Sequence, residues 1–347
     1  MHRGTELRTP NRFERTSLEA FEDGWEAPEL RELPVIQTEF LPDHTKSILA
    51  KNDSPDVGFQ YSINAYRGCE HGCAYCYARP THEYLGFNAG IDFESKIMVK
   101  HDAAELLRSA FDRPSWKPQV VLMSGNTDCY QPAERIYGIT RQLLEVFLAY
   151  RNPVGIISKN ALVLRDLDLL SELACMNLVS VHHSVTTLDR ALARKLEPRT
   201  STPERRLASM RALTDAGVPT GVMIGPVIPG LNDEEIPAIL QAARDAGASS
   251  AGYNMVRLPY SVKPIFEEWL DRNVPMEAKK VRARIEMVRD GRMNDPDFGS
   301  RMRGTGAYAD YIKDVFKKTC TRLGLNQDHA ELTTEHFRRP GEMTLFD

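Results

Sequence analysis

Short apolar stretches alternate with longer amphipathic stretches through the middle of the chain. The short stretches are VVLMS (120–124), VGIIS (154–158), LVSVHHS (178–184), PTGVMIGPV (219–227) and SSAGYNMVRL (249–258). The longer ones, with helical patterns, are ERIYGITRQLLEVFLAYR, VLRDLDLLSELA, PERRLASMRALTDAG and DEEIPAILQAARDAG. Alternation of strands and helices of this kind predicts successive right-handed βαβ units and a parallel sheet.

A further strand is expected near FQYSINAYRG (59–68), which makes six strand–helix units. Two of the predicted helices stop at Gly217 and Gly247, where glycine can adopt the left-handed conformation. Six units are too few for a closed eight-unit barrel, so a partial barrel or a doubly wound sheet remains. We predict an α/β fold with a partial (β/α)6 TIM-like barrel, in which polar segments after the strands converge on one face.

The two ends of the chain lack this alternation. Residues 1–56 contain prolines and acidic clusters without a sustained period, which predicts an extended arm, wrapped over the core or partly disordered. The core is predicted to span residues 57–290. Residues 291–347 are predicted to form a C-terminal helical extension and tail, with glycines near Arg301 and Arg303 that indicate a lid over the barrel mouth.

Composition indicates a globular protein, because 347 residues with 42% hydrophobic content can bury a sizeable core. No apolar run approaches the roughly 18 to 20 residues that cross a bilayer. The start, MHRGTELRTPNRFERTSLEAFEDGWE, is charged throughout and has no signal-peptide core. We therefore expect a cytoplasmic protein that does not bind membranes.

The net charge of −4 conceals a basic region. Residues 279–322 carry twelve Lys and Arg against six Asp and Glu, whereas residues 1–56 carry seven against twelve. The basic region is either a solvated helix face or a surface for a polyanion such as nucleic acid.

Three of the six cysteines, Cys69, Cys73 and Cys76, lie within the segment GCEHGCAYCYARP (68–80). In a reducing compartment, clustered thiols indicate metal binding or catalysis rather than disulfides. A structural zinc site takes four protein ligands, and this loop adds only His71. Electron-transfer ferredoxins use a cysteine for every iron of a four-iron cluster. Three thiolates would leave one iron open to bind another molecule.

The spacing Cys-x3-Cys-x2-Cys with an aromatic residue before the third cysteine, CEHGCAYC, resembles the signature of the radical S-adenosylmethionine (SAM) superfamily. The resemblance implies a [4Fe–4S] cluster on Cys69, Cys73 and Cys76 whose open iron binds SAM. It implies reductive cleavage of SAM to a 5′-deoxyadenosyl radical, which abstracts hydrogen from a substrate. It also implies an external one-electron reductant of the flavodoxin or ferredoxin type.

The same resemblance assigns SAM-binding roles to polar residues that follow the predicted strands. The candidates are Tyr75, Thr127, Asp128, Ser158, Lys159 and Ser184. Lys159 is expected to pair with the SAM carboxylate through a charge-assisted hydrogen bond. Glu197 and Arg199, in LEPRTSTPERR, are expected either to pair over the ribose or to lock the loop.

Within the superfamily, CAYCYARP, TDCYQPAE, SKNALVLRDLDLL, LEPR and PVIPGLND resemble the branch that includes spore photoproduct lyase. Tyr75 and Tyr77 match a tyrosine pair of that branch and are candidate catalytic residues. The lyase's hydrogen-donor cysteine has no counterpart, because Gly125 falls at about that position. Cys129, beside Asp128, is therefore either a hydrogen donor or a small buried hydrophobic residue.

Two classes of function remain open. The first is a radical SAM enzyme that acts on nucleic acid, or on another large anion, in a lyase-like or repair-like reaction. The second modifies a small metabolite or peptide and has no nucleic-acid role. Salt-dependent nucleic-acid binding separates the two, because phosphate contacts give a steep salt slope. The tail EMTLF (342–346) is faintly similar to the peptide by which bacterial repair proteins dock on the sliding clamp.

Overall fold

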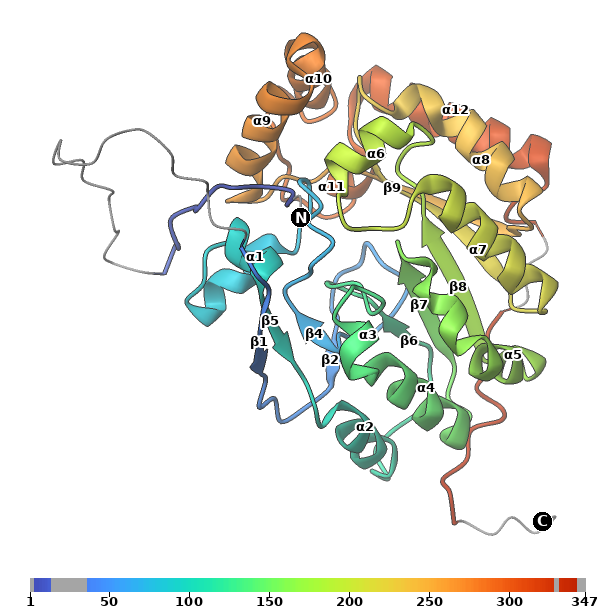
Figure 1. Cartoon of the computed structure of the whole chain (residues 1–347). Coiled ribbons are helices and arrows are strands. Elements are labelled where there is room, and N and C mark those ends of the chain that lie inside the picture. Colours follow the sequence, from blue (N-terminus) through green and yellow to red (C-terminus); the bar gives the residue numbers. More distant parts are fainter. Residues whose placement is uncertain (1–2, 14–35, 328–330, 342–347) are drawn as a thin grey trace, which may run out of the picture.

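The main sheet has seven strands in the order β10-β9-β8-β7-β6-β3-β2 (Figure 1). This is a computed structural model, and it describes residues 3–13, 36–327 and 331–341. The strands are β2 (Leu49–Lys51), β3 (Tyr61–Ile63), β6 (Val121–Met123), β7 (Val154–Ser158), β8 (Val179–Ser184), β9 (Thr220–Val227) and β10 (Ser250–Met255). All neighbours from β3 to β10 pair in parallel, so the predicted strands are confirmed.

Each new parallel strand is added at the same edge of the sheet. This sequential order is that of a (β/α) barrel, whereas the order in a doubly wound sheet reverses. Within the described residues, β10 and β2 form the two edges of the sheet and do not pair with each other. The predicted α/β fold with a parallel sheet is therefore confirmed, and the strand order is the one expected of a partial barrel.

A layer of helices covers the outer face of the sheet (Figure 1). The longer helices of this layer are α2 (Ala103–Phe111), α4 (Ile139–Tyr150), α5 (Leu167–Cys175), α7 (Pro203–Asp215) and α8 (Ile236–Asp245). Their apolar sides pack on the strands; Leu143 and Phe147 of α4, for example, are fully buried in one cluster with Val121. As predicted, α7 and α8 are followed by Gly217 and Gly247, with φ of 78° and 98°.

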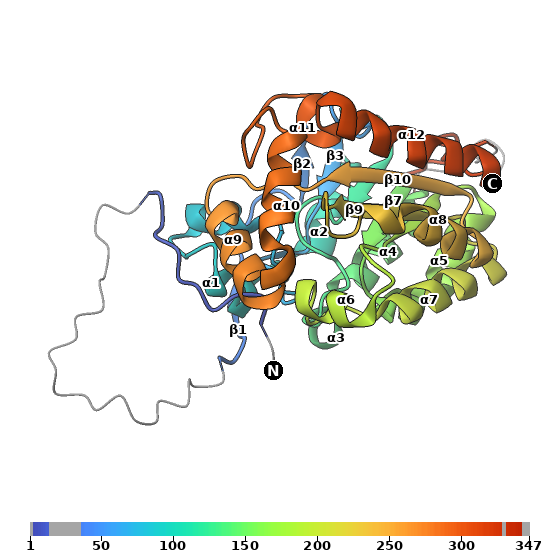
Figure 2. The ribbon, with the colours of Figure 1, turned by 90° about the horizontal axis from the view of Figure 1, so that it is seen from above.

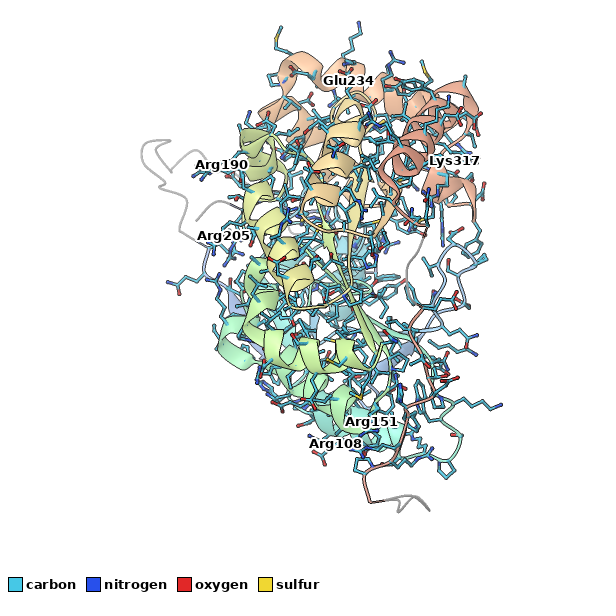
Figure 3. All side chains as sticks on the ribbon, turned by 90° about the vertical axis from the view of Figure 1, so that its right-hand side faces the viewer. Arg108, Arg151, Arg190, Arg205, Glu234 and Lys317 are labelled. Atoms are coloured by element: carbon cyan, nitrogen blue, oxygen red, sulfur yellow. The ribbon has the colours of Figure 1, made fainter. Side chains whose placement is uncertain are left out.

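Shorter helices connect these elements, and the outer surface of the layer is polar. The short helices are η1 (Arg79–Leu85), α1 (Ile91–Ser95), α3 (Glu134–Tyr137), η2 (Ala161–Asp166), α6 (Arg190–Leu196) and η3 (Asp233–Glu235). Arg108, Arg190, Arg205 and Lys317 lie exposed at the surface (Figure 3).

The predicted N-terminal arm contributes strands to two sheets. A three-stranded sheet has the order β1-β5-β4, formed by β1 (Glu39–Pro42), β4 (Tyr66–Arg67) and β5 (Lys96–Val99). β1 runs parallel to β5, and β4 runs antiparallel to it. β2 pairs antiparallel with β3 in the main sheet. The described part of the arm beyond residue 36 is thus built into the fold by backbone pairing.

After β10, α9 (Val262–Asn273) packs against α10 (Pro275–Met287), and their Trp269 and Ile285 share a buried cluster with Ala74 and Tyr75. Two further helices follow, α11 (Ser300–Arg303) and α12 (Gly306–Leu323). α12 packs against α8 and runs beside β10 (Figure 2), so it covers the sheet edge rather than the strand ends.

Within the described residues, no helix is both long and apolar enough to span a membrane. The predicted clamp-docking tail (342–346) lies outside the described residues, as do residues 14–35 of the predicted arm.

Candidate active site

The cysteine loop, residues 68–78, follows β4 and turns at two glycines. Gly68 and Gly72 have φ of 79° and 69°, in the left-handed region. A Cβ atom on Gly68 would lie 2.9 Å from the Phe93 carbonyl oxygen, and one on Gly72 would lie 2.7 Å from Glu94 Oε2. Glycine is therefore required by conformation and by space at the positions directly before Cys69 and Cys73.

A buried ion pair holds the loop in place. Arg79 is fully buried and donates to the Cys73 carbonyl from Nε (3.1 Å) and Nη2 (2.9 Å). Its Nη2 also lies 2.5 Å from Glu94 Oε1. Because a buried charge is costly without a partner, the two residues depend on each other. Nothing in the sequence pattern signalled this pair.

The N-terminal segment lies across the same loop. The Gly4 N–H donates to Glu94 Oε2 at 2.9 Å, and Ile91 N–H donates to the Leu7 carbonyl at 3.0 Å. A Cβ atom on Gly4 would lie 1.6 Å from the Gly72 carbonyl oxygen, so the two backbones are in direct contact. Residues 3–7 therefore form a strap over the cysteine loop, and we use this name below.

The three cysteines of the loop lie near one another. Cys69 and Cys73 are buried, and Cys76 is half-buried. Cys76 packs against the buried cluster that contains Cys73 and against the one that contains Cys69. Burial raises the pKa of Cys69, and the charges of Asp128, Cys73 and Cys76 raise it further. Bound iron would favour the thiolate forms, because metal ligation requires deprotonated sulfur. The donor set therefore fits an iron–sulfur cluster.

The ring nitrogens of His71, in the same loop, contact Asp128 and Asn160 rather than the cysteines. Its Nδ1 lies 3.4 Å from Asp128 Oδ2, and its Nε2 lies 3.3 Å from Asn160 Nδ2. The neutral tautomer with hydrogen on Nδ1 satisfies both contacts. In the part of the chain that the structure describes, no three His, Cys, Asp or Glu side chains are arranged around a single metal ion.

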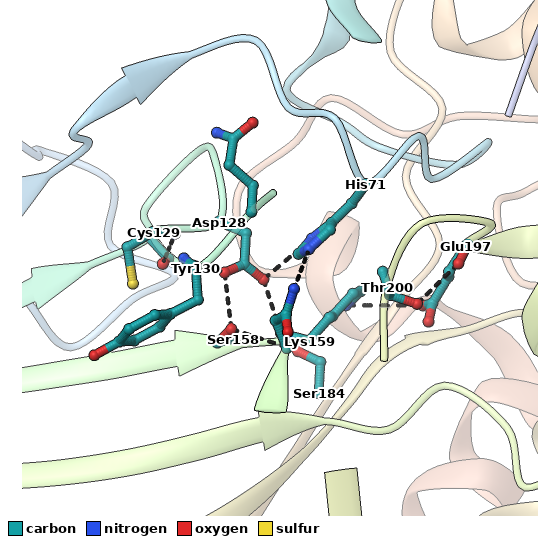
Figure 4. Close-up of polar contacts among 12 residues, drawn as sticks. His71, Asp128, Cys129, Tyr130, Ser158, Lys159, Ser184, Glu197 and Thr200 are labelled. Atoms are coloured by element: carbon teal, nitrogen blue, oxygen red, sulfur yellow. Dashed lines mark hydrogen bonds and ion pairs between the residues drawn. The ribbon is translucent and has the colours of Figure 1, made fainter. Parts of the chain in front are cut away.

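Asp128 ties the loop after β6 to the end of β7 and to the cysteine loop (Figure 4). Its Oδ1 accepts from Ser158 Oγ (2.8 Å) and from the Tyr130 N–H (2.9 Å). Its Oδ2 accepts from the Lys159 N–H at 2.7 Å. Burial by itself raises the pKa of Asp128, but His71 and these hydrogen bonds outweigh burial and hold the pKa below its ordinary value. Both carboxylate oxygens of Asp128 thus accept hydrogen bonds from other residues of the protein. Direct contact between Asp128 and SAM stays a prediction.

Lys159, which follows β7, directs its ammonium group toward the cysteine loop. Its Nζ lies 5.9 Å from the centroid of the Tyr75 ring and 3.9 Å from Glu197 Oε1. Burial raises the pKa of Cys73 and of Cys76, and the positive charge of Lys159 partly opposes this in both thiols. The lysine is thus the cation that lies between the strand ends and the predicted cluster ligands.

Glu197 is a buried carboxylate that lies near Lys159 and forms an ion pair with Arg206. It accepts hydrogen bonds from Tyr75 Oη, from Arg206 Nη2 and, at 2.5 Å, from Thr186 Oγ1. Burial alone raises the pKa of Glu197, but Arg206 and Lys159 lower it to about 2. The network joins the cysteine loop to the ends of β7 and β8 and to α7.

Glu197 and Arg199 do not pair with each other. Arg199 Nη2 instead donates to Glu70 Oε1 at 2.8 Å, inside the cysteine loop, while Glu197 pairs with Arg206. Of the two interpretations left open by the sequence, the observed contacts match locking of the loop.

The other predicted SAM-binding residues lie at neighbouring strand ends. Thr127 Oγ1 donates to a carbonyl of β4 at 2.8 Å. Ser184 is buried at the end of β8, and its carbonyl accepts from Arg206 Nη1 at 2.8 Å. Tyr77 Oη donates to the Gly125 carbonyl at 2.5 Å, while its side chain stays 43% exposed. The structure brings these residues to one end of the sheet, and their contacts with SAM stay predictions.

Cys129 lies in the hydrophobic core rather than in this network. It is 2% exposed and belongs to a buried cluster with Tyr130 and Leu143. Burial raises the pKa of its thiol. The thiol lies on the side of the loop away from Lys159 and Glu197 (Figure 4). This placement favours the packing interpretation, and the hydrogen-donor role stays a prediction.

Replacement Cys129→Ala separates the two interpretations. We expect the variant to lose about 1 kcal/mol of stability, as for a small cavity, and to keep its cluster and SAM cleavage. Urea unfolding and the yield of 5′-deoxyadenosine measure these quantities. Unchanged stability together with lost or altered substrate product would instead assign the donor role to Cys129.

Comparison with known proteins identifies the class. Residues 63–243 match the sequence model of the Radical SAM superfamily. The chain belongs to this superfamily, as the cysteine spacing predicted. An uncharacterized protein of Mycobacterium tuberculosis is 38% identical over 292 residues, which cover 83% of this chain and 82% of that protein.

Two further relatives are described by an activity. Radical SAM Nalpha-GlyT isomerase of Pseudomonas phage M6 is 23% identical over 74% of this chain and 50% of that protein. The solved structure of spore photoproduct lyase complexed with dinucleoside spore photoproduct has a TM-score of 0.59 at 17% identity. The match covers 82% of this chain and 80% of the lyase chain. The fold is therefore similar to that of spore photoproduct lyase, the enzyme that the sequence motifs resemble.

Proposed function

We propose that this radical SAM enzyme cleaves SAM reductively and uses the 5′-deoxyadenosyl radical to abstract hydrogen from a substrate. A [4Fe–4S] cluster, when bound, supplies the electron for this cleavage, drawn from an external flavodoxin-like or ferredoxin-like reductant. Cys69, Cys73 and Cys76 would hold the cluster. The observation that carries the proposal is the gathering of these three cysteines in one loop beside the ends of the parallel strands, with Cys76 packed against the buried clusters of Cys73 and Cys69.

The chain's own residues would bind and orient SAM beside the loop. Among the described residues, Lys159 Nζ has one carboxylate neighbour, Glu197 at 3.9 Å, and it donates a hydrogen bond to the Gly225 carbonyl at 3.1 Å. Its ammonium group can therefore donate to an incoming carboxylate, which gives a strong charge-assisted bond. Asp128 would act indirectly, because it fixes the backbone of Lys159.

Replacement Lys159→Ala tests this role. We expect SAM binding to weaken by about 1.5 to 3 kcal/mol, the range for hydrogen bonds to charged groups, with the iron content unchanged. Equilibrium binding of SAM to the reconstituted protein measures the effect. Lys195→Ala is the matched control, because Lys195 is exposed on α6 and donates to the Asn273 carbonyl. Equal SAM affinity in the two variants would show that Lys159 does not bind the SAM carboxylate.

For the substrate we propose a nucleic acid or one of its components, in a lyase-like or repair-like step. The basic region 279–322 supports this class by charge. The lyase with the similar fold was solved in complex with a dinucleoside spore photoproduct, which supports the same class by analogy. The competing class is a small metabolite or peptide.

An untargeted comparison of cells with and without the protein tests the substrate class. We expect nucleosides from digested nucleic acid to differ between the two, because a radical modification or its reversal leaves a chemically altered base or sugar. Differences confined to small metabolites or peptides would contradict the nucleic-acid proposal while leaving SAM cleavage intact.

A further inference from the structure

Arg257 lies two residues beyond β10, at the same end of the sheet as the cysteine loop. Its Cζ is 5.4 Å from the ring centroid of Tyr77, the residue that follows Cys76. Tyr77 is 43% exposed and is tied by its hydroxyl to the loop after β6. The guanidinium therefore lies over a solvent-facing ring directly beside the predicted cluster ligands.

The guanidinium of Arg257 has no carboxylate partner among the described residues. Its one polar contact there is from Nη1 to Met302 Sδ, at 3.7 Å, and its Nε is buried without a hydrogen-bond partner. Arginine stays charged and carries five N–H donors, and burying the Nε–H donor without an acceptor costs free energy. An oxyanion placed here would give the guanidinium donors an acceptor.

The arginines around Arg257 are already engaged. Arg301 pairs with Asp56, between β2 and β3, and donates to Ser54 Oγ at 2.8 Å. Arg303 Nη1 donates to the carbonyl of an edge-strand residue, Tyr253, at 2.8 Å. Burial and the charge of Arg301 lower the pKa of Arg257, and Tyr77 and Asp56 oppose them in part. Unlike Arg301 and Arg303, the Arg257 guanidinium donates to no oxygen atom of the described residues, so its donors remain available to an added oxyanion.

We propose that Arg257 binds a phosphate group of the substrate and holds it above Tyr77, beside the cysteine loop. This inference rests on the proposed nucleic-acid function. A guanidinium matches phosphate oxygens with two parallel N–H donors, and stacking on an aromatic ring fixes the plane of the fork. The phosphate would thereby place the neighbouring sugar and base within the site.

Charge-removing variants test the assignment. Arg257→Gln is compared with Arg205→Gln, which removes an equal charge from the exposed surface of α7 (Figure 3). The probes are a fluorescein-labelled short single-stranded DNA and a fluorescein-labelled glutamate-rich peptide of equal net charge. Affinity is measured by anisotropy over a range of salt concentrations. Cleavage of SAM without either probe shows that each variant is folded and loaded.

We expect Arg257→Gln to weaken DNA binding about tenfold at low salt. The slope of log affinity against log salt should fall by about 0.7, the value for one contact to a single strand. Arg205→Gln should match the wild type in both quantities. Arg257→Lys should recover only part of the affinity, because it restores the charge without the bidentate geometry.

The outcomes separate this inference from the proposed function. Equal DNA affinity and salt slope in Arg257→Gln and the wild type would overturn the role of Arg257 alone. Arg257-dependent binding of the acidic peptide, without an effect on DNA, would overturn the phosphate assignment in favour of a carboxylate. Absence of DNA binding by wild-type protein that still cleaves SAM would overturn both the inference and the nucleic-acid function.

Discussion

Alanine at Cys69, Cys73 or Cys76 should abolish both cluster binding and SAM cleavage. Each replacement leaves two thiolates for a cluster that needs three protein ligands. A second iron would then lack a protein ligand, in addition to the iron that is open to SAM. Anaerobically reconstituted wild-type protein should hold about four irons per chain and form 5′-deoxyadenosine when reduced, whereas the variants should do neither. Iron and sulfide analysis and chromatography of the nucleoside product provide the measurements.

Cys175→Ala is the matched control for these variants. Cys175 is an exposed cysteine at the end of α5, so its removal takes away one thiol without touching the loop. It should retain full iron content and full SAM cleavage. Full cleavage by zinc-loaded, iron-free protein would contradict the assignment of the three loop cysteines to an iron–sulfur cluster.

Glu197→Ala should destabilise the fold by about 3 to 5 kcal/mol, because it leaves the buried Arg206 without its ion-pair partner. Urea unfolding at neutral pH measures the loss. Glu172→Ala, at an exposed position of α5, should change stability little. Combining Glu197→Ala with Arg206→Met should recover part of the loss, since the stranded charge is removed. A loss in Glu197→Ala no larger than in Glu172→Ala would show that the network adds no stability.

The effect of Glu197 should also depend on pH in a defined direction. The fold lowers the pKa of this carboxyl from 4.5 to about 2, so the ionised form is favoured in the folded state. Its stabilising contribution is complete above pH about 4.5 and is lost as the pH falls toward about 2. The stability difference between wild type and Glu197→Ala should therefore shrink over this interval. A constant difference across it would contradict the assigned charge.

The sheet could be predicted because its strands are buried on both faces. VGIIS and PTGVMIGPV read as apolar runs, since helices cover one side of each strand and the barrel interior the other. β1 and β2 gave no such signal, because four and three residues are too few to show a period. α9 and α10 were missed because they pack on the cysteine loop and not on the sheet.

The site could be predicted where spacing along the chain decides the chemistry. Cys69, Cys73 and Cys76 are identified by local spacing, and the strand-end rule located Lys159. The pairing of Arg79 with Glu94 depends on how loops fold back on one another, which residue spacing does not encode. Gly125 shows a further limit, because a Cβ atom there would lie 2.9 Å from Ser62 Oγ. Any side chain at position 125 would crowd Ser62 of β3, so the packing of this strand disfavours a donor cysteine there.

The strap over the cysteine loop has a consequence for how the enzyme is made. Residues 3–7 are synthesised before Gly72 and Glu94, which they contact. The strap can therefore settle into place only after the cysteine loop has been made. Iron and sulfide delivered before that moment meet an uncovered loop, whereas delivery to the finished protein requires the strap to lift. Expression with concurrent cluster assembly should consequently load the enzyme more completely than reconstitution afterwards.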